Sequence, residues 1–160
     1  MRFPSFPTLL IQLGFATGLL LYATLASAEE PVSLMFGDPA ERHVEIVFGA
    51  DRSGPEALVI TTRRVGNPGA RLSISIDRSQ NWILRRILTE DDCSFDNLGA
   101  TCRVTVAGDT AKYNAFVIGF ARAKTAHVAV ENAATMEMSD DIDLDGFRAA
   151  YGPEAAARGA

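Results

Sequence analysis

Alternation of apolar and polar residues predicts β-strands along most of the chain. The clearest segment is Arg71–Asp77, in which every second residue is Leu or Ile and serines lie between them. This period of two is typical of a strand with one buried face. Less regular segments of the same kind predict further strands at Val32–Phe36, His43–Phe48, Ala57–Arg63, Trp82–Leu88, Cys102–Val106, Ala126–Glu131 and Thr135–Leu144.

The period changes to that of a helix between Asp109 and Lys124. Four large apolar residues fall there at i, i+3, i+4 and i+7, which places them on one helical face. Asp109 or Thr110 is a suitable N-cap. We expect the stripe to pack in the core; it consists of Tyr113, Phe116, Val117 and Phe120.

These elements predict an α+β fold, mostly β: an antiparallel β-sandwich-like sheet with one packed amphipathic helix. A short final helix is expected at Phe147–Tyr151, because Gly152-Pro153 is a helix-stopping pair. Residues 153–160 are small and polar, and we expect a flexible tail there. The predicted domain is therefore a single β-rich unit over residues 29–152.

The first 28 residues have the pattern of a secretory signal peptide. Arg2 precedes an apolar run from Leu9 to Leu25, and Ala26-Ser27-Ala28 follows as a small-residue cleavage site. We expect cleavage after Ala28 and a periplasmic or secreted mature chain without a stable membrane span. An uncleaved anchor is the alternative, although the apolar run is near the minimum spanning length.

Charge argues against nucleic-acid binding. The whole chain carries a formal charge of −5, and loss of residues 1–28 removes Arg2 and no acid, which makes it −6. The basic residues are scattered, whereas contact with a phosphate backbone requires clustered Lys and Arg.

The two cysteines, Cys93 and Cys102, predict one disulfide. Export would place them in an oxidising compartment, where a single pair usually forms a bridge. Closing a loop of about ten residues contributes roughly 2.5 to 3 kcal/mol in the chain-entropy model. The bridge is expected to join two neighbouring strands across their connection.

The segment Asp141–Gly152 allows two interpretations. Asp141, Asp143 and Asp145, with Gly146, match the first half of a calcium loop. The twelfth position of such a loop requires Glu, but Gly152 stands there. We therefore favour a strand running into a short helix, with Asp145 as its cap and Phe147 in the core. Calcium binding by the three acids is kept as the alternative, and no other cofactor is predicted.

No catalytic site is predicted. His43 and His127 fall in different expected strands, and zinc usually requires three or four ligands. There is no Gly-x-Ser-x-Gly elbow and no Gly-rich phosphate loop. The acidic pair Asp91-Asp92 is expected to be solvated.

Residues 72–152 resemble the invasion-associated locus B family of small proteins exported by alphaproteobacteria. The resemblance rests on the order of the elements and on a family-like ending with an apolar residue, a spacer, Gly-Phe and small residues. The chain departs from the family in its cysteines, which lie farther apart than is usual and lack a second pair upstream. The matching segments are Ile74–Asp77, the cysteine pair with Gly99, Asp109–Lys124, Ala126–Glu131 and Asp143–Ala150. In the last of these, Leu144, Gly146 and Phe147 are expected to close the fold over the core.

The resemblance implies a β-rich envelope protein without catalytic residues, linked in some pathogens to entry into host cells. We therefore expect a non-enzymatic protein that acts through an unidentified protein or envelope partner. A small ligand-binding or calcium-binding periplasmic module is the alternative.

Overall fold

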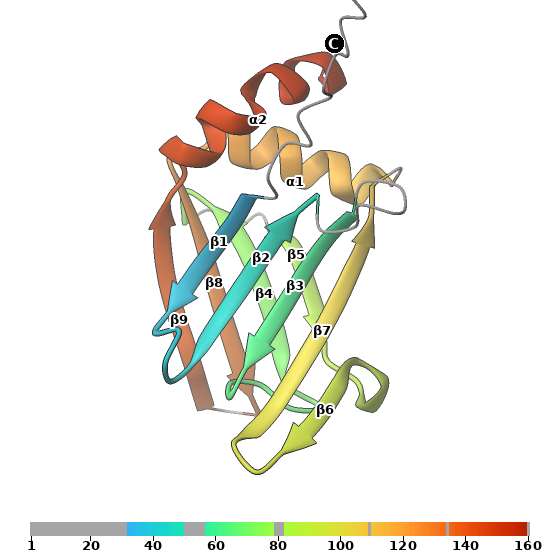
Figure 1. The fold of residues 1–160 in the computed structure, drawn as a ribbon, viewed down its shortest axis with the longest axis vertical. Coiled ribbons are helices and arrows are strands. Elements are labelled where there is room, and N and C mark those ends of the chain that lie inside the picture. The colour runs from blue at the N-terminus through green and yellow to red at the C-terminus, as the bar shows by residue number, and fades with distance from the viewer. Residues whose placement is uncertain (1–31, 50–56, 79–81, 109, 134, 160) are drawn as a thin grey trace, which may run out of the picture.

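Two antiparallel sheets face each other across the hydrophobic core (Figure 1). The computed structural model describes residues 32–49, 57–78, 82–108, 110–133 and 135–159. The proposed signal peptide and Asp109 lie outside these residues. The first sheet has the strand order β1-β2-β3-β7-β6, and the second has the order β5-β4-β8-β9. Their strands are β1 (Val32–Gly37), β2 (His43–Phe48), β3 (Ala57–Arg63), β4 (Arg71–Ile76), β5 (Trp82–Ile87), β6 (Cys93–Asp96), β7 (Gly99–Ala107), β8 (Thr125–Asn132) and β9 (Thr135–Asp143).

The alternating apolar residues face the core as predicted, but Ser73 and Ser75 between them are buried as well, which the alternation did not predict. In β4 the Leu72 and Ile74 side chains are fully buried between the sheets, and in β2 the same is true of Val44, Ile46 and Phe48. The predicted sandwich-like fold is therefore confirmed. The sequence did not predict β6, because this strand has four residues and none of them is buried.

Helix α1 (Ala111–Arg122) connects β7 in the first sheet to β8 in the second. Thr110 is its N-cap, and the Thr110 hydroxyl accepts a hydrogen bond from the Tyr113 amide at 3.2 Å. The predicted stripe of Tyr113, Phe116, Val117 and Phe120 is buried in the core, as expected.

Helix α2 (Asp145–Arg158) corrects two predictions, because it neither ends at Tyr151 nor leaves a flexible tail. Pro153 lies inside the helix and removes one backbone donor. Packing against α1 compensates: Ala155 is buried, and the Arg158 guanidinium donates to Asn114 Oδ1 at 2.7 Å. That guanidinium also lies 5.1 Å from the centre of the Tyr113 ring.

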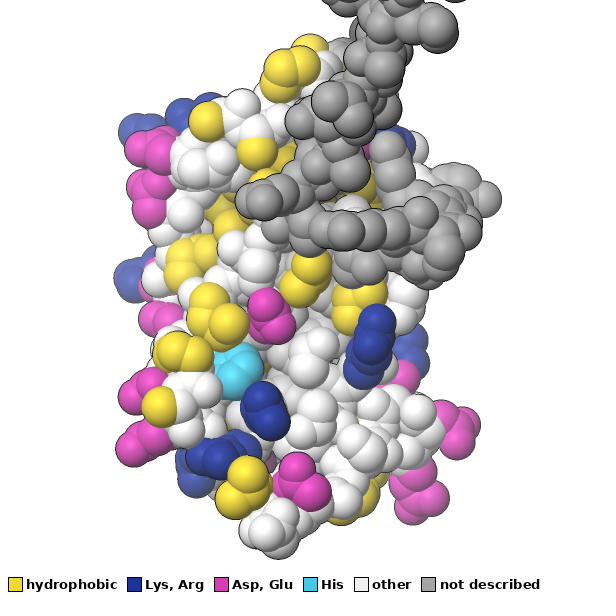
Figure 2. Space-filling model, viewed as in Figure 1, with side chains coloured by type: hydrophobic (Ala, Val, Ile, Leu, Met, Phe, Trp, Pro, Cys, Tyr) yellow, Lys and Arg dark blue, Asp and Glu magenta, His cyan; other side chains and the backbone are white. Residues whose placement is uncertain are grey.

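The two helices cover one end of the sandwich, and the β6–β7 hairpin extends from the opposite end (Figure 1). On the face made by β1, β2, β3 and β7, hydrophobic side chains are mixed with charged and polar ones (Figure 2). Lys and Arg do not gather into one patch on that face, in keeping with the scattered charge in the sequence.

Candidate functional site

The predicted disulfide is present and joins neighbouring strands. Cys93 in β6 and Cys102 in β7 lie directly opposite each other in the antiparallel ladder, with their Cα atoms 3.9 Å apart. Cys102 is completely buried, whereas Cys93 is partly buried. The bridge thus attaches the exposed strand β6 to a strand that belongs to the core.

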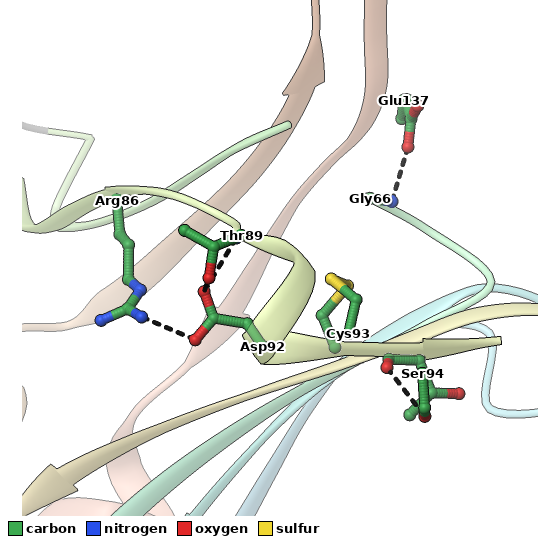
Figure 3. Close-up of a disulfide and its surroundings, with 9 residues drawn as sticks. Gly66, Arg86, Thr89, Asp92, Cys93, Ser94 and Glu137 are labelled. Atoms are coloured by element: carbon green, nitrogen blue, oxygen red, sulfur yellow. Dashed lines mark hydrogen bonds and ion pairs between the residues drawn. A yellow bond between two sulfur atoms is a disulfide. The ribbon is translucent and has the colours of Figure 1, made fainter. Parts of the chain in front are cut away.

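A short helical turn, η1 (Glu90–Asp92), leads into Cys93 (Figure 3). The Asp92 carboxylate accepts hydrogen bonds from the Thr89 hydroxyl at 2.7 Å and the Thr89 amide at 2.8 Å, and it pairs with Arg86 at 2.6 Å. Partial burial alone would raise the pKa of Asp92, but these bonds outweigh burial and hold the pKa below its usual value. Asp92 is therefore a fixed structural anion, and the predicted solvated pair is wrong at this residue.

The tip of the β6–β7 hairpin exposes two large apolar side chains. Phe95 is 66% exposed and Leu98 is 54% exposed. The tip itself is ordered locally, since the Leu98 amide donates to Asp96 Oδ1 at 2.7 Å. A surface hollow of about 540 Å³ adjoins these residues and is also lined by Arg42 and Arg64. We call Phe95, Leu98 and these two arginines the hairpin surface.

Burial of Leu144 and Phe147 at the end of the fold is confirmed, whereas the roles expected for Gly146 and Asp145 are wrong. Leu144 and Phe147 are buried, and the Phe147 ring stacks on Tyr151 with centroids 4.8 Å apart. Gly146 is exposed, and a Cβ added there would meet no atom within 4 Å, so no packing requires glycine. Asp145 is not the cap: Leu144 holds the N-cap position, and Asp145 pairs with Arg148.

The three acids of the calcium alternative do not converge. Asp141 pairs with Arg78 and His127, Asp143 Oδ1 accepts from the Asp145 amide at 2.7 Å, and Asp145 pairs with Arg148. Within the described ranges, no group of three or more His, Cys, Asp or Glu side chains is placed to hold a metal ion. Asp141 and Asp143 lie two residues apart along the extended strand β9 and Asp145 lies in α2, whereas a calcium loop would fold all three around the ion.

The two histidines lie in different sheets. His43 in β2 is buried, and its Nδ1 atom has no hydrogen-bond partner among the described residues. His127 in β8 is partly buried, and its Nδ1 atom lies 3.0 Å from Asp141 Oδ1. The structure therefore does not bring the two histidines into one site.

Sequence reasoning missed a polar row that crosses the outer face of the second sheet. The strand registers place Trp82 opposite Ser75, Ser75 opposite His127, and His127 opposite Asp141. Alternation already indicates that Ser75, His127 and Asp141 point away from the core. Trp82 has the same parity as the buried Leu84, and the β-bulge beside Ile74 and Ser75 turns it to the outer face. Their alignment in one row depends on strand order and register, which the separate segments do not reveal.

Arg78 joins this row from the turn after β4. Its guanidinium Nε donates to Asp141 Oδ2 at 3.0 Å. Asp77 and Arg78 both have positive φ angles, 48° and 49°, which L-residues seldom adopt. Asp77 Oδ1 holds this turn by accepting from the Lys124 and Thr125 amides at 2.9 and 3.0 Å. The backbone therefore adopts an unfavourable conformation that carries Arg78 to Asp141.

The electrostatics of Asp141 follow from these contacts. The hydrogen bond from Arg78 is the main cause of a pKa below the usual aspartate value. Partial burial acts in the opposite direction, and His127 adds to the lowering. Asp141 is thus ionised at neutral pH, and each of its oxygens already has a partner.

The row contains the residue types of a serine hydrolase, but it lacks the corresponding arrangement. Ser75 is only 1% exposed, and its hydroxyl makes no hydrogen bond to any described residue. A nucleophile needs a hydrogen bond to its general base, and Ser75 makes none to His127. The geometry therefore fits binding better than acyl transfer.

No helix in the described part of the chain combines the length and hydrophobicity needed to cross a membrane. Comparison with protein-family models, with curated proteins and with solved structures found no match to this chain.

Proposed function

We propose that this chain is an exported, non-enzymatic envelope protein that binds a protein partner through the hairpin surface. The periplasmic or secreted location is supported by the signal-like residues 1–28 and by the disulfide. The resemblance to the invasion-associated locus B family points to the same class of protein. The observation that carries the proposal is the disulfide-linked hairpin with Phe95 and Leu98 exposed at its tip.

Strand β6 and the tip of the hairpin contribute little to the hydrophobic core, so packing of the core does not explain why they are present. Strand β6 contains no buried residue, and the apolar side chains at the tip remain largely in water. A scattered exposed apolar residue is ordinary, but two on one projecting hairpin form a candidate contact surface. The bridge maintains a projecting structure that has little packing of its own.

The disulfide also prepares the hairpin for binding. A cross-link restricts the conformations of β6 and of the tip before a partner arrives. Less conformational entropy is then lost on association, and more of the contact energy appears as affinity. A rigid aromatic side chain on such a support is a typical binding anchor.

The chemistry of the surface defines the kind of partner. Phe95 and Leu98 would fit a shallow apolar depression on the partner. Arg42 and Arg64 line the same hollow of this protein as Phe95 and Leu98. The neighbouring Glu137 is already engaged, because its carboxylate accepts from the Gly66 amide at 2.6 Å (Figure 3). We infer a folded protein partner with apolar side chains bordered by carboxylates.

Site-specific photo-crosslinking in intact cells tests this proposal. A photoreactive residue in place of Phe95 should give a discrete adduct with one partner, and Leu98→Ala should reduce its yield. The matched control position is Ile87, which is 50% exposed but belongs to β5 in the other sheet. Replacing Cys93 by Ser should also lower the yield at position 95.

Two results would contradict the proposal. One is the absence of any adduct from position 95 in exported protein with an intact bridge. The other is an equal adduct from position 87, which would indicate non-specific surface contact. Intact mass and cell fractionation check cleavage and export separately, so a failure of export is distinguished from a failure of binding.

A further inference from the structure

The outer face of the second sheet carries a groove that the hairpin function does not use. The groove has a volume of about 640 Å³ and lies along the row Trp82, Ser75, His127 and Asp141, with Arg78 beside it. It belongs to a different sheet from the β6–β7 hairpin. A concave site with a few convergent polar groups is the usual form of a small-molecule site.

Both carboxylates that line the groove already accept hydrogen bonds within the protein. Asp141 is shared between His127 and Arg78. Asp140 accepts from the Gly37 amide at 2.6 Å and from the Asp141 amide at 2.9 Å. An anionic ligand would approach both of these carboxylates, and a cationic ligand would approach the Arg78 guanidinium. The pattern favours an uncharged ligand.

The hydrogen-bonding groups include both donors and acceptors. The ionised Asp141 carboxylate can only accept, so the proton between the two residues is carried by His127 Nδ1, and in that tautomer of the imidazole the Nε2 atom is an acceptor. Arg78 retains guanidinium donors beyond the two that contact Asp141. A hydroxyl group both donates and accepts, so several hydroxyls on one ligand match this set.

Trp82 supplies a flat apolar surface at the same place. Its side chain is 39% exposed, and its ring centroid lies 6.4 Å from that of His127. Tryptophan offers a large apolar face together with one N–H donor. The C–H face of a sugar ring can stack on such a surface while its hydroxyls reach the polar row.

Ser75 provides an independent indication of a ligand. Its hydroxyl is buried between the Trp82 and His127 positions and has no hydrogen-bond partner among the described residues. Such a group lowers the stability of the folded protein, because water is lost and no bond replaces it. A ligand hydroxyl entering between Trp82 and His127 would satisfy it.

We propose that this groove binds a neutral polyhydroxylated ligand of the carbohydrate class. Trp82 stacks on the apolar ring face, His127 Nε2 accepts from a ligand hydroxyl, and Arg78 donates to another. Asp141 positions both polar side chains. This binding is separate from the partner contact at the hairpin surface and does not depend on it.

Trp82 makes the test direct, because it is the chain's single tryptophan. Its fluorescence is titrated with glucose, galactose and N-acetylglucosamine, and with maltotriose to separate an oligosaccharide from a free sugar. Sodium phosphate and choline chloride serve as charged comparators. We expect a saturable change with at least one sugar, at a dissociation constant of roughly 0.1 to 10 mM, as for a weak, small ligand.

Variants assign the response to the groove. His127→Ala and Asp141→Asn should each weaken sugar binding by about tenfold, equivalent to about 1.4 kcal/mol. Ile87→Ala, in the same strand as Trp82 but outside the groove, should bind as the wild type. Ser75→Ala should weaken binding without lowering the urea midpoint of the free protein, which separates a binding role from a structural one.

The proposal is overturned if no sugar produces a saturable change up to about 100 mM, ten times the weakest dissociation constant expected. A response to phosphate or choline without one to sugars would also overturn it, as would wild-type affinity in both the His127 and Asp141 variants. Circular dichroism on every variant shows whether a lost response reflects unfolding. If the His127 and Asp141 variants do not fold, the Ser75→Ala variant, which lacks only a hydroxyl, still tests the proposal through its affinity for sugar.

Discussion

Replacing Phe147 by Ala should lower the free energy of unfolding by about 4 kcal/mol. The side chain is 1% exposed, and its ring centroid lies 4.6 Å from Phe48, 4.8 Å from Tyr151 and 5.6 Å from Phe120. Truncating a buried aromatic costs about 3 to 5 kcal/mol, because apolar burial is lost and a cavity remains. That is a large part of the roughly 5 to 15 kcal/mol that stabilises a domain.

Urea unfolding followed by circular dichroism measures this change. Gly146→Ala is the matched neighbour: the new Cβ meets no atom within 4 Å, and a helical alanine should raise stability by about 0.5 to 1 kcal/mol. Phe147→Leu keeps much of the volume and should lose only about 1 to 2 kcal/mol. A loss below about 1 kcal/mol for Phe147→Ala would refute the packing argument. A loss of that size for Gly146→Ala would restore glycine as a required part of the closure.

Three further predictions concern the bridge, Asp141 and the end of α2. Cys93→Ser with Cys102→Ser should lower stability by roughly 2.5 to 3 kcal/mol, and reduction of the wild type should raise its intact mass by about two daltons; equal stability with and without the bridge would contradict the first part. Because the folded-state pKa of Asp141 lies below its unfolded value of about 3.9, its contribution is present above about pH 4 and is lost as pH falls through the folded pKa. The stability difference between wild type and Asp141→Asn should therefore shrink in acid, and a difference independent of pH would argue against the ion pair. Deleting residues 152–160 should cost roughly 2 kcal/mol through loss of the buried Ala155 and of the Arg158 contact with Tyr113, whereas an unchanged urea midpoint would restore the flexible tail.

The pattern of residues along the chain predicted the structure correctly where burial of apolar side chains on one face dominates the stability of a segment. The alternation in Arg71–Asp77 and the apolar stripe in α1 both reflect burial of one face, so strand, helix and core were predictable there. Pairing of the two cysteines followed from their number and from expected export. Phe147 was predicted to be buried from the strand-to-helix interpretation of Asp141–Gly152 and from the family-like ending, and its burial is confirmed.

The end of α2 illustrates what local pattern does not reveal. Gly152-Pro153 is unfavourable within an isolated helix, and on that ground the sequence predicted a stop. Contacts with α1 outweigh the local tendency of Gly152-Pro153 to end the helix. Arg158 in α2 contacts Asn114 and Tyr113, which are distant from it in the sequence. Similarly, the spacing of three acids left calcium binding open as an alternative, and only the structure shows that each acid has its own partner.

The sequence by itself determined the β-rich class, the faces of most strands, the central helix and the bridge, since each depends on residues close together in the chain or on their chemistry. Only the tertiary structure decided which strands are neighbours and in what register. That choice places Ser75, His127 and Asp141 in one row and leaves Phe95 exposed at the tip of a linked hairpin. The physical reason is that register and sheet order arise from the packing of the whole core, which no single segment specifies.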